Sequence, residues 1–145
     1  MTLRLRPCLL ACAVGAVAAM AARPATADEA RYRSGYFPEL ARQVLADEPG
    51  AFAELLAVAH DTPGGAKLEE LAELSSRYLA INPRQFLRDQ SGSTHCFGVD
   101  FMGDVFVDRD ETRQAERAMR IELLESIDDP ELAASQSTCL RELRR

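Results

Sequence analysis

The chain contains no tryptophan, one lysine and only two histidines, and shortages of this kind argue against several classes of protein. With three tyrosines and six phenylalanines as its only aromatic residues, a groove of rings that stack on sugars is not expected. The 17 basic residues are outnumbered by 23 acidic ones, a formal net charge of −6. This balance argues against a nucleic-acid binder, which needs a basic face to meet phosphates. What is present, 145 residues of which 47% are hydrophobic, suits a single folded domain.

The sequence motifs of common enzymes are also missing. There is no His-Glu-x-x-His box, phosphate-binding loop, Gly-x-Ser-x-Gly elbow or dinucleotide fingerprint. His60 is followed by Asp61, but the pair stands before Gly64-Gly65, so we interpret it as a helix end and turn rather than part of a catalytic triad. The protein is therefore not expected to be an enzyme. A hydrolytic enzyme that uses His60, His95 or an acidic cluster is kept as an alternative.

Residues 1–27 have the pattern of a cleaved secretory signal peptide. Arg4 and Arg6 precede an uncharged run over residues 8–22, and Ala25-Thr26-Ala27 fits the small-x-small rule for cleavage before Asp28. The run is too short and too rich in alanine to span a bilayer. The segment carries three arginines and no acidic residue, so its removal changes the formal charge from −6 to −9. We expect a periplasmic or secreted protein, with no stable membrane insertion after cleavage.

The cysteines support the same location. Cys8 and Cys12 leave with the signal segment, so Cys96 and Cys139 remain as an even pair. In an oxidising compartment such a pair forms a disulfide by default. We therefore predict a Cys96–Cys139 bridge rather than a free catalytic thiol beside His95.

Residues 28–145 are predicted to form a single all-helical domain of about six to seven helices with one disulfide. Apolar residues recur at helical spacing over 37–45, 52–59, 68–79 and 86–87. A later helix is expected to bury the side chains of Ala115, Ala118, Met119, Leu123 and Ile127. The last helix is expected to bury those of Leu132, Cys139, Leu140 and Leu143. Residues 95–107 alternate partly like a strand, but no second strand-like segment exists to pair with them, so we interpret them as a helix.

A residue that can cap a helix stands before proline at Glu48-Pro49, Asn82-Pro83 and Asp129-Pro130. This spacing favours a short stack of antiparallel helical hairpins, which at the level of architecture resembles a HEAT- or armadillo-type array. An irregular helical bundle is the alternative.

Besides the two histidines, acidic residues provide candidates for metal binding or acid–base chemistry. Asp100, Asp104, Asp108 and Asp110 could gather around a cation, but their spacing is not that of a calcium loop, so no metal or cofactor is expected. Two further groups could supply paired carboxylates for glycoside hydrolysis, and we interpret them as solvated helix faces: Glu69, Glu70 and Glu73, and Glu122 with Glu125. Arg141, Arg144 and Arg145 suit the C-terminal end of a helix dipole.

These observations lead to one functional hypothesis and two alternatives. We expect a small exported acidic helical protein that binds a protein partner in the cell envelope, as an inhibitor or immunity protein does. The acidic charge favours a basic partner. The first alternative is a periplasmic holdase or stress protein that exposes apolar surface in acid. The second is the hydrolytic enzyme named above.

Overall fold

The computed structural model describes residues 35–103 and 110–145. These residues form six α-helices, one 3-10 turn and no strand, so the prediction of an all-helical fold is confirmed. The elements are α2 (Tyr36–Leu45), α3 (Ala51–Asp61), α4 (Ala66–Ile81), α5 (Pro83–Asp89), α6 (Asp110–Glu125), η2 (Pro130–Leu132) and α7 (Ala133–Leu143). The proposed signal segment, residues 1–27, lies outside the described residues.

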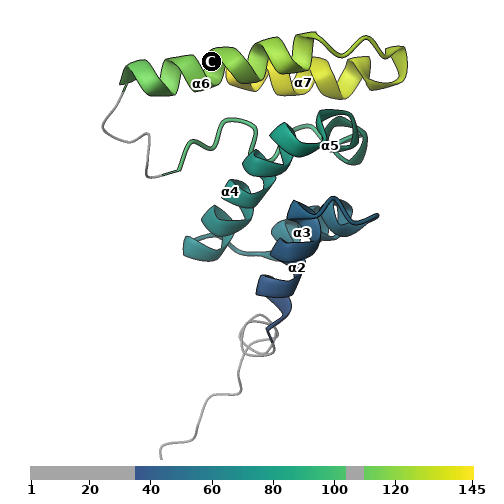
Figure 1. Ribbon diagram of the computed structural model, residues 1–145, viewed down its shortest axis with the longest axis vertical. Helices are drawn as coiled ribbons and strands as arrows, with labels where there is room; N and C mark the ends of the chain where they lie inside the picture. Colours follow the sequence, from purple (N-terminus) through teal and green to yellow (C-terminus); the bar gives the residue numbers. More distant parts are fainter. Residues whose placement is uncertain (1–34, 104–109) are drawn as a thin grey trace, which may run out of the picture.

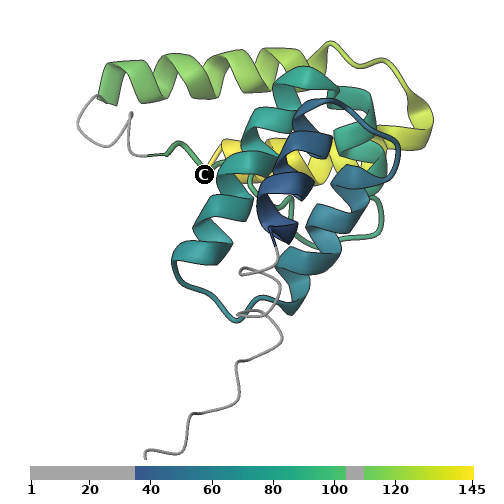
Figure 2. The same ribbon diagram turned by 60° about the horizontal axis from the view of Figure 1, so that its bottom comes forward.

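The helices follow one another along the molecule in chain order. In Figure 1, α2 and α3 lie at one end, α4 and α5 in the middle, and α6 beside α7 at the other end. Helix α4 packs on α2, α3 and α5, α5 also contacts α7, and α6 packs chiefly on α7. Figures 1 and 2 both show the first turns of α6 extending beyond the end of α7. Within the described ranges, no helix is long and apolar enough to cross a membrane.

Two of the three cap-and-proline pairs act at helix starts. The side chain of Asn82 accepts a hydrogen bond from the backbone N–H of Gln85 at 3.1 Å, and α5 begins with the proline between them. Asp129 accepts in the same way from Glu131 at 3.0 Å, although the proline there opens the 3-10 turn. Helix α3 instead begins after Gly50 at φ 83° and has no side-chain cap.

Three stacked rings form the centre of the core. Phe52 of α3 lies with its ring centroid 4.3 Å from that of Tyr78 of α4 and 5.3 Å from that of Phe86 of α5. All three side chains are buried. Stacked aromatic pairs add to the stability that burial alone provides, so these rings join α3, α4 and α5 into one body.

The interpretation of residues 95–107 as a helix is wrong for residues 95–103, which form turns and extended chain; residues 104–107 lie outside the described ranges. Gly98 has φ 76°, a left-handed conformation that does not continue a helix. The carbonyls of Phe97, Val99 and Phe101 accept hydrogen bonds from side chains of other elements. These long-range bonds replace the local bonds of a helix.

The buried face predicted for α6 is also wrong in its first half. Ala115, Ala118 and Met119 are exposed, whereas Arg120 and Leu124 are buried. The helix is therefore turned so that a charged side chain faces the protein. This is possible because buried partners satisfy the guanidinium of Arg120, as described below.

Candidate binding groove

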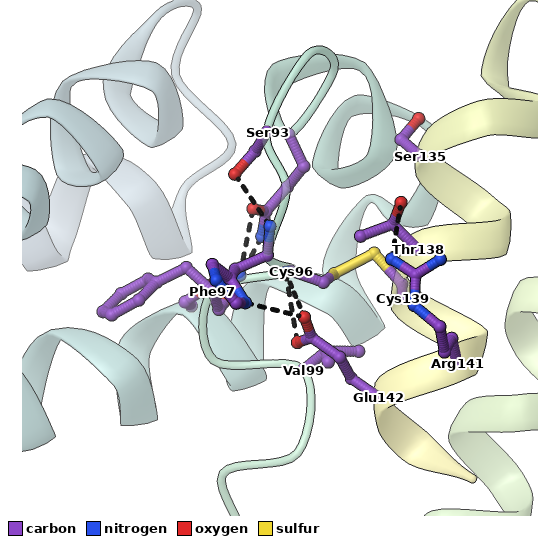
Figure 3. The surroundings of a disulfide bond; sticks show 12 residues. Ser93, Cys96, Phe97, Val99, Ser135, Thr138, Cys139, Arg141 and Glu142 are labelled. Atoms are coloured by element: carbon purple, nitrogen blue, oxygen red, sulfur yellow. Dashed lines mark hydrogen bonds and ion pairs between the residues drawn. A yellow bond between two sulfur atoms is a disulfide. The ribbon is translucent and has the colours of Figure 1, made fainter. Parts of the chain in front are cut away.

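The predicted disulfide is present and joins the segment after α5 to α7. Cys96 and Cys139, 43 residues apart, are bonded and are 2% and 0% exposed (Figure 3). A bridge that closes a loop of this length stabilises a fold by about 4 kcal/mol in the chain-entropy account. Because both sulfur atoms are buried, we assign the bridge a structural role rather than a redox one.

Glu142, one turn after Cys139 on α7, makes a second tie to the same segment. Both of its carboxylate oxygens accept from the backbone N–H of Cys96 at 3.1 Å (Figure 3). One of them also lies 3.4 Å from Nδ1 of His95, a side chain that is 80% exposed. His95 therefore lies at the surface beside a buried bridge.

The segment of residues 96–101, which Glu142 ties to α7, is also held by side chains of α4 and of the turn after α5. The hydroxyl of Ser75 donates to the carbonyl of Phe97 at 2.7 Å, and that of Ser76 donates to the carbonyl of Phe101 at 3.0 Å. The side-chain amide of Gln90 both donates to and accepts from the backbone of Phe97 at 3.0 Å. The segment is thus fixed closely against α4.

Arg120 on α6 completes this attachment. Its Nη1 donates to the carbonyls of Val99 and Phe101, each at 2.8 Å, and its Nε donates to a carboxylate oxygen of Glu116 at 2.8 Å. The residue is 8% exposed. Sequence reasoning missed it, although its spacing of four residues from both Glu116 and Leu124 marks them as one helix face.

A groove of about 830 Å³ runs along α4, between this helix and the end of the attached segment. One wall is the exposed face of α4, and the other wall is formed by residues 101–103 together with part of α6. The side chains that matter below are three glutamates of α4, Glu69, Glu70 and Glu73, and two large apolar residues, Ile81 and Phe101. The remaining lining residues are Leu45, Ala66, Ser76, Arg77, Ala80, Met102, Gly103, Glu116 and Arg120.

A smaller hollow of about 170 Å³ continues the groove toward α2. It shares Leu45, Glu70, Glu73 and Arg77 with the groove and is lined by apolar side chains of α2 and α4. Lys67 and Phe37 also line this hollow, and Nζ of Lys67 lies 3.3 Å from the centre of the Phe37 ring, a cation–π contact. Glu70 and Glu73 thus border apolar surface both in the groove and in the hollow.

The available charge in the groove is negative. Glu69, Glu70 and Glu73 are exposed, and the structure gives them no ion pair with another described residue. Of the two arginines in the lining, Arg120 is occupied by Glu116 and two carbonyls. Among the described residues that line the groove, this leaves Arg77 to oppose the three glutamates, and Lys67 lines the adjoining hollow. The sequence identified these glutamates as a charged helix face, and the structure places that face along a groove.

The other residues considered for chemistry are separated. His60 and Asp61 are exposed at the end of α3, whereas His95 contacts Glu142 of α7. Glu125 pairs with Arg144, and Glu122 is exposed on α6. We find no arrangement of a nucleophile and a base among these side chains. Arg141 lies in the last turn of α7, as expected for the helix dipole, and Arg145 follows that helix as an exposed residue.

The four aspartates proposed as weak metal candidates are described only in part. Asp100 is exposed in the segment before residue 103, and Asp110 is exposed in the first turn of α6, while Asp104 and Asp108 lie outside the described residues. Asp100 is not part of a helix. Across residues 35–103 and 110–145, no three His, Cys, Asp or Glu side chains are grouped so that they could hold a metal ion.

A separate carboxylate links the turn after α2 to the end of α4. Asp47, at φ 53°, accepts from the hydroxyl of Tyr78 at 2.5 Å and from the side-chain amide of Asn82 at 2.9 Å. These two hydrogen bonds lower the pKa of Asp47. Burial, together with the bond to Asp47, raises the pKa of Tyr78. The contact is structural and lies outside the groove lining.

Comparison of the chain with protein-family models, with curated protein sequences and with solved structures finds no match.

Proposed function

We propose that the protein is a small exported, acidic, helical protein that binds a basic protein partner in the cell envelope, as an inhibitor or immunity protein does. The observation that carries this proposal is the groove along α4, in which Glu69, Glu70 and Glu73 are free to meet positive charge. The negative charge of the whole chain acts in the same direction, because complementary charge speeds the association of two proteins.

Two further features support the proposal. A buried disulfide suits an oxidising compartment, and therefore a periplasmic or secreted protein. The contacts of α2 with α3, of α4 with α5 and of α6 with α7 suit a stack of three antiparallel helical hairpins. Stacked helix pairs present extended surfaces that many such proteins use to bind other proteins.

The test is a crosslinking pull-down of the full chain, tagged at its C-terminus and expressed in the cells that produce it. We expect one dominant partner at near-equal stoichiometry, in a complex that weakens as salt rises. The mass of the purified protein should place its N-terminus at Asp28. A complex that is insensitive to salt would contradict the charge-based part of the proposal. The absence of any specific partner would contradict the function.

A second candidate, an acid-activated holdase, is favoured by the role of carboxylates in holding the fold. Glu142 holds the Cys96 backbone, Glu116 holds Arg120, and Asp47 holds Tyr78. The pKa of Asp47 is lowered by its hydrogen bonds to Tyr78 and Asn82, so its protonation in acid would remove this contact and favour exposure of apolar surface. This candidate predicts dye binding at about pH 3 and capture of many unrelated proteins only in acid. A rigid monomer at that pH would exclude it.

A further inference from the structure

Among the residues that the structure describes, one face of helix α4 is left uncovered along the length of the helix. The groove lining includes Ala66 at the start of the helix, three glutamates in its first half, and Ile81 at its end. At 1.5 Å per residue this face is about 22 Å long. The groove therefore has the length of about four turns of a second helix lying beside α4.

The opposite wall is fixed in place before any partner binds. The carbonyl of Phe101 accepts from the hydroxyl of Ser76 at 3.0 Å and from Nη1 of Arg120 at 2.8 Å. One bond comes from α4 and the other from α6, so both sides of the groove hold the same residue. A preformed groove does not lose binding free energy to ordering of its own walls.

Apolar and charged groups are arranged along the groove as an amphipathic partner requires. Ile81, which is 43% exposed, and the half-buried Phe101 offer apolar contacts, and Leu45 adds a third at the end of α2. Glu69 and Glu73 lie one turn apart on α4 and offer negative charge. A partner helix would match this surface with apolar residues on one face and Lys or Arg beside them.

We propose that the groove along α4 binds one amphipathic, cationic α-helix of the basic partner. This inference rests on the proposed function and adds the site and the form of the recognised segment. A second copy of this acidic chain fits the groove less well, because its net charge of −6 would be repelled by the glutamates.

The first test measures binding of a labelled 18-residue helical peptide with leucine on one face and lysine on its flanks, by fluorescence anisotropy on the exported protein. We expect salt-sensitive binding. The triple variant E69Q/E70Q/E73Q should bind about tenfold more weakly, since exposed charge pairs each contribute modestly. The matched control is E122Q/D128N/E131Q, which alters three exposed acidic residues outside the groove lining and changes the net charge equally. The control should change affinity less than about twofold. Equal weakening by both triples would overturn the proposal.

A second pair of variants tests the apolar contacts. Ile81→Asp should weaken peptide binding, whereas Met119→Asp should not, because Met119 is 59% exposed on α6 outside the groove lining. Both positions are exposed, so neither change should prevent folding. A photo-crosslinker at position 81 then identifies the native occupant. A crosslink to a helix of the captured partner supports the proposal, and a crosslink to the same chain or to a second copy overturns it.

The native complex separates failure of this site from failure of the function. If the pull-down captures a specific partner that E69Q/E70Q/E73Q still binds, the groove is not the site and the proposed function stands. If that variant loses the native partner while the helical peptide never binds, the occupant is not a helix of this kind, and the inference is overturned. If no specific partner is captured, the proposed function itself has failed.

Discussion

Helices α3, α4 and α5 meet through stacked aromatic rings, whereas α6 and α7 join the same core through buried aliphatic side chains and are further held by polar groups and one covalent bond. In the first region Phe52 lies between Tyr78 and Phe86. In the second, the guanidinium of Arg120 and the Cys96–Cys139 bridge hold the segment after α5 to the last two helices. Apolar packing tolerates changes of pH and redox state, whereas carboxylates respond to pH and disulfides respond to redox state. The two regions should therefore fail under different conditions.

The largest expected effect comes from breaking the aromatic region. Phe52→Ala removes a ring that is 1% exposed and should reduce the free energy of unfolding by about 3 to 5 kcal/mol. Urea unfolding followed by circular dichroism measures the loss. Met119→Ala is the control, because its side chain is 59% exposed and its truncation should cost less than about 0.5 kcal/mol. Similar losses for the two variants would show that the stacked rings are not the centre of stability.

Removing the disulfide tests the second region directly. The double variant C96A/C139A should lose about 2 to 4 kcal/mol, because the unfolded chain regains the freedom that the bridge removes. Hydrogen exchange should accelerate first in α7 and in residues 96–101, with α3 and α4 still protected. Equal loss of protection in α3 and α7 would show that the two regions are one cooperative unit and would remove the distinction between them.

Two glycine variants sharpen the comparison at the junction of the regions. A Cβ atom on Gly98 would lie 2.6 Å from Cβ of Ser75 and 2.7 Å from the carbonyl oxygen of Ala72. Gly92 has a similar φ of 82°, but a Cβ there would meet nothing within 4 Å. Both alanine variants impose backbone strain, so Gly98→Ala should cost about 1 to 3 kcal/mol more than Gly92→Ala. Equal unfolding free energies would mean that the segment moves away from α4 without cost.

The same division explains what the sequence could predict. The faces of α3 to α5 follow apolar spacing, so Phe52, Leu55, Leu79 and Phe86 were placed correctly in the core. The face of α6 was missed because Arg120 is buried against carbonyls of residues 99 and 101, which lie far away in the chain. Residues 95–103 were predicted to be helical because nothing local shows that Ser75, Ser76 and Gln90 bind their backbone.

The sequence could likewise predict the candidate groove only in part. Helical spacing places Glu69, Glu70 and Glu73 on an outer face, and the structure confirms that they are exposed. Helical spacing does not show that residues 101–103 stand opposite these glutamates, because that wall depends on hydrogen bonds from two different helices. Pairwise spacing predicts faces, whereas a groove requires knowledge of which faces stand across from each other.

The smallest expected effect concerns Asp47, whose carboxylate accepts a hydrogen bond from Tyr78 of the aromatic region. The pKa of Asp47 is lowered by its hydrogen bonds to Tyr78 and Asn82, so its folded form holds a proton less tightly than its unfolded form. Its contribution to stability is therefore present above the unfolded pKa of about 3.9 and is lost as the pH falls through the lower folded value. Asp47→Asn should lower stability at neutral pH and make it depend less on pH below about 5.

Urea unfolding of wild type and D47N at a series of pH values measures this change in slope. Asparagine tolerates the left-handed conformation of Asp47, so strain should not confuse the result. The matched control is Asp61→Asn at the exposed end of α3, which makes the same change of side chain away from Tyr78 and Asn82. If D47N keeps the full acid sensitivity, the hydrogen bonds of Asp47 do not carry that sensitivity. The aromatic region would then owe none of it to this carboxylate, which would make the contrast between the two regions sharper still.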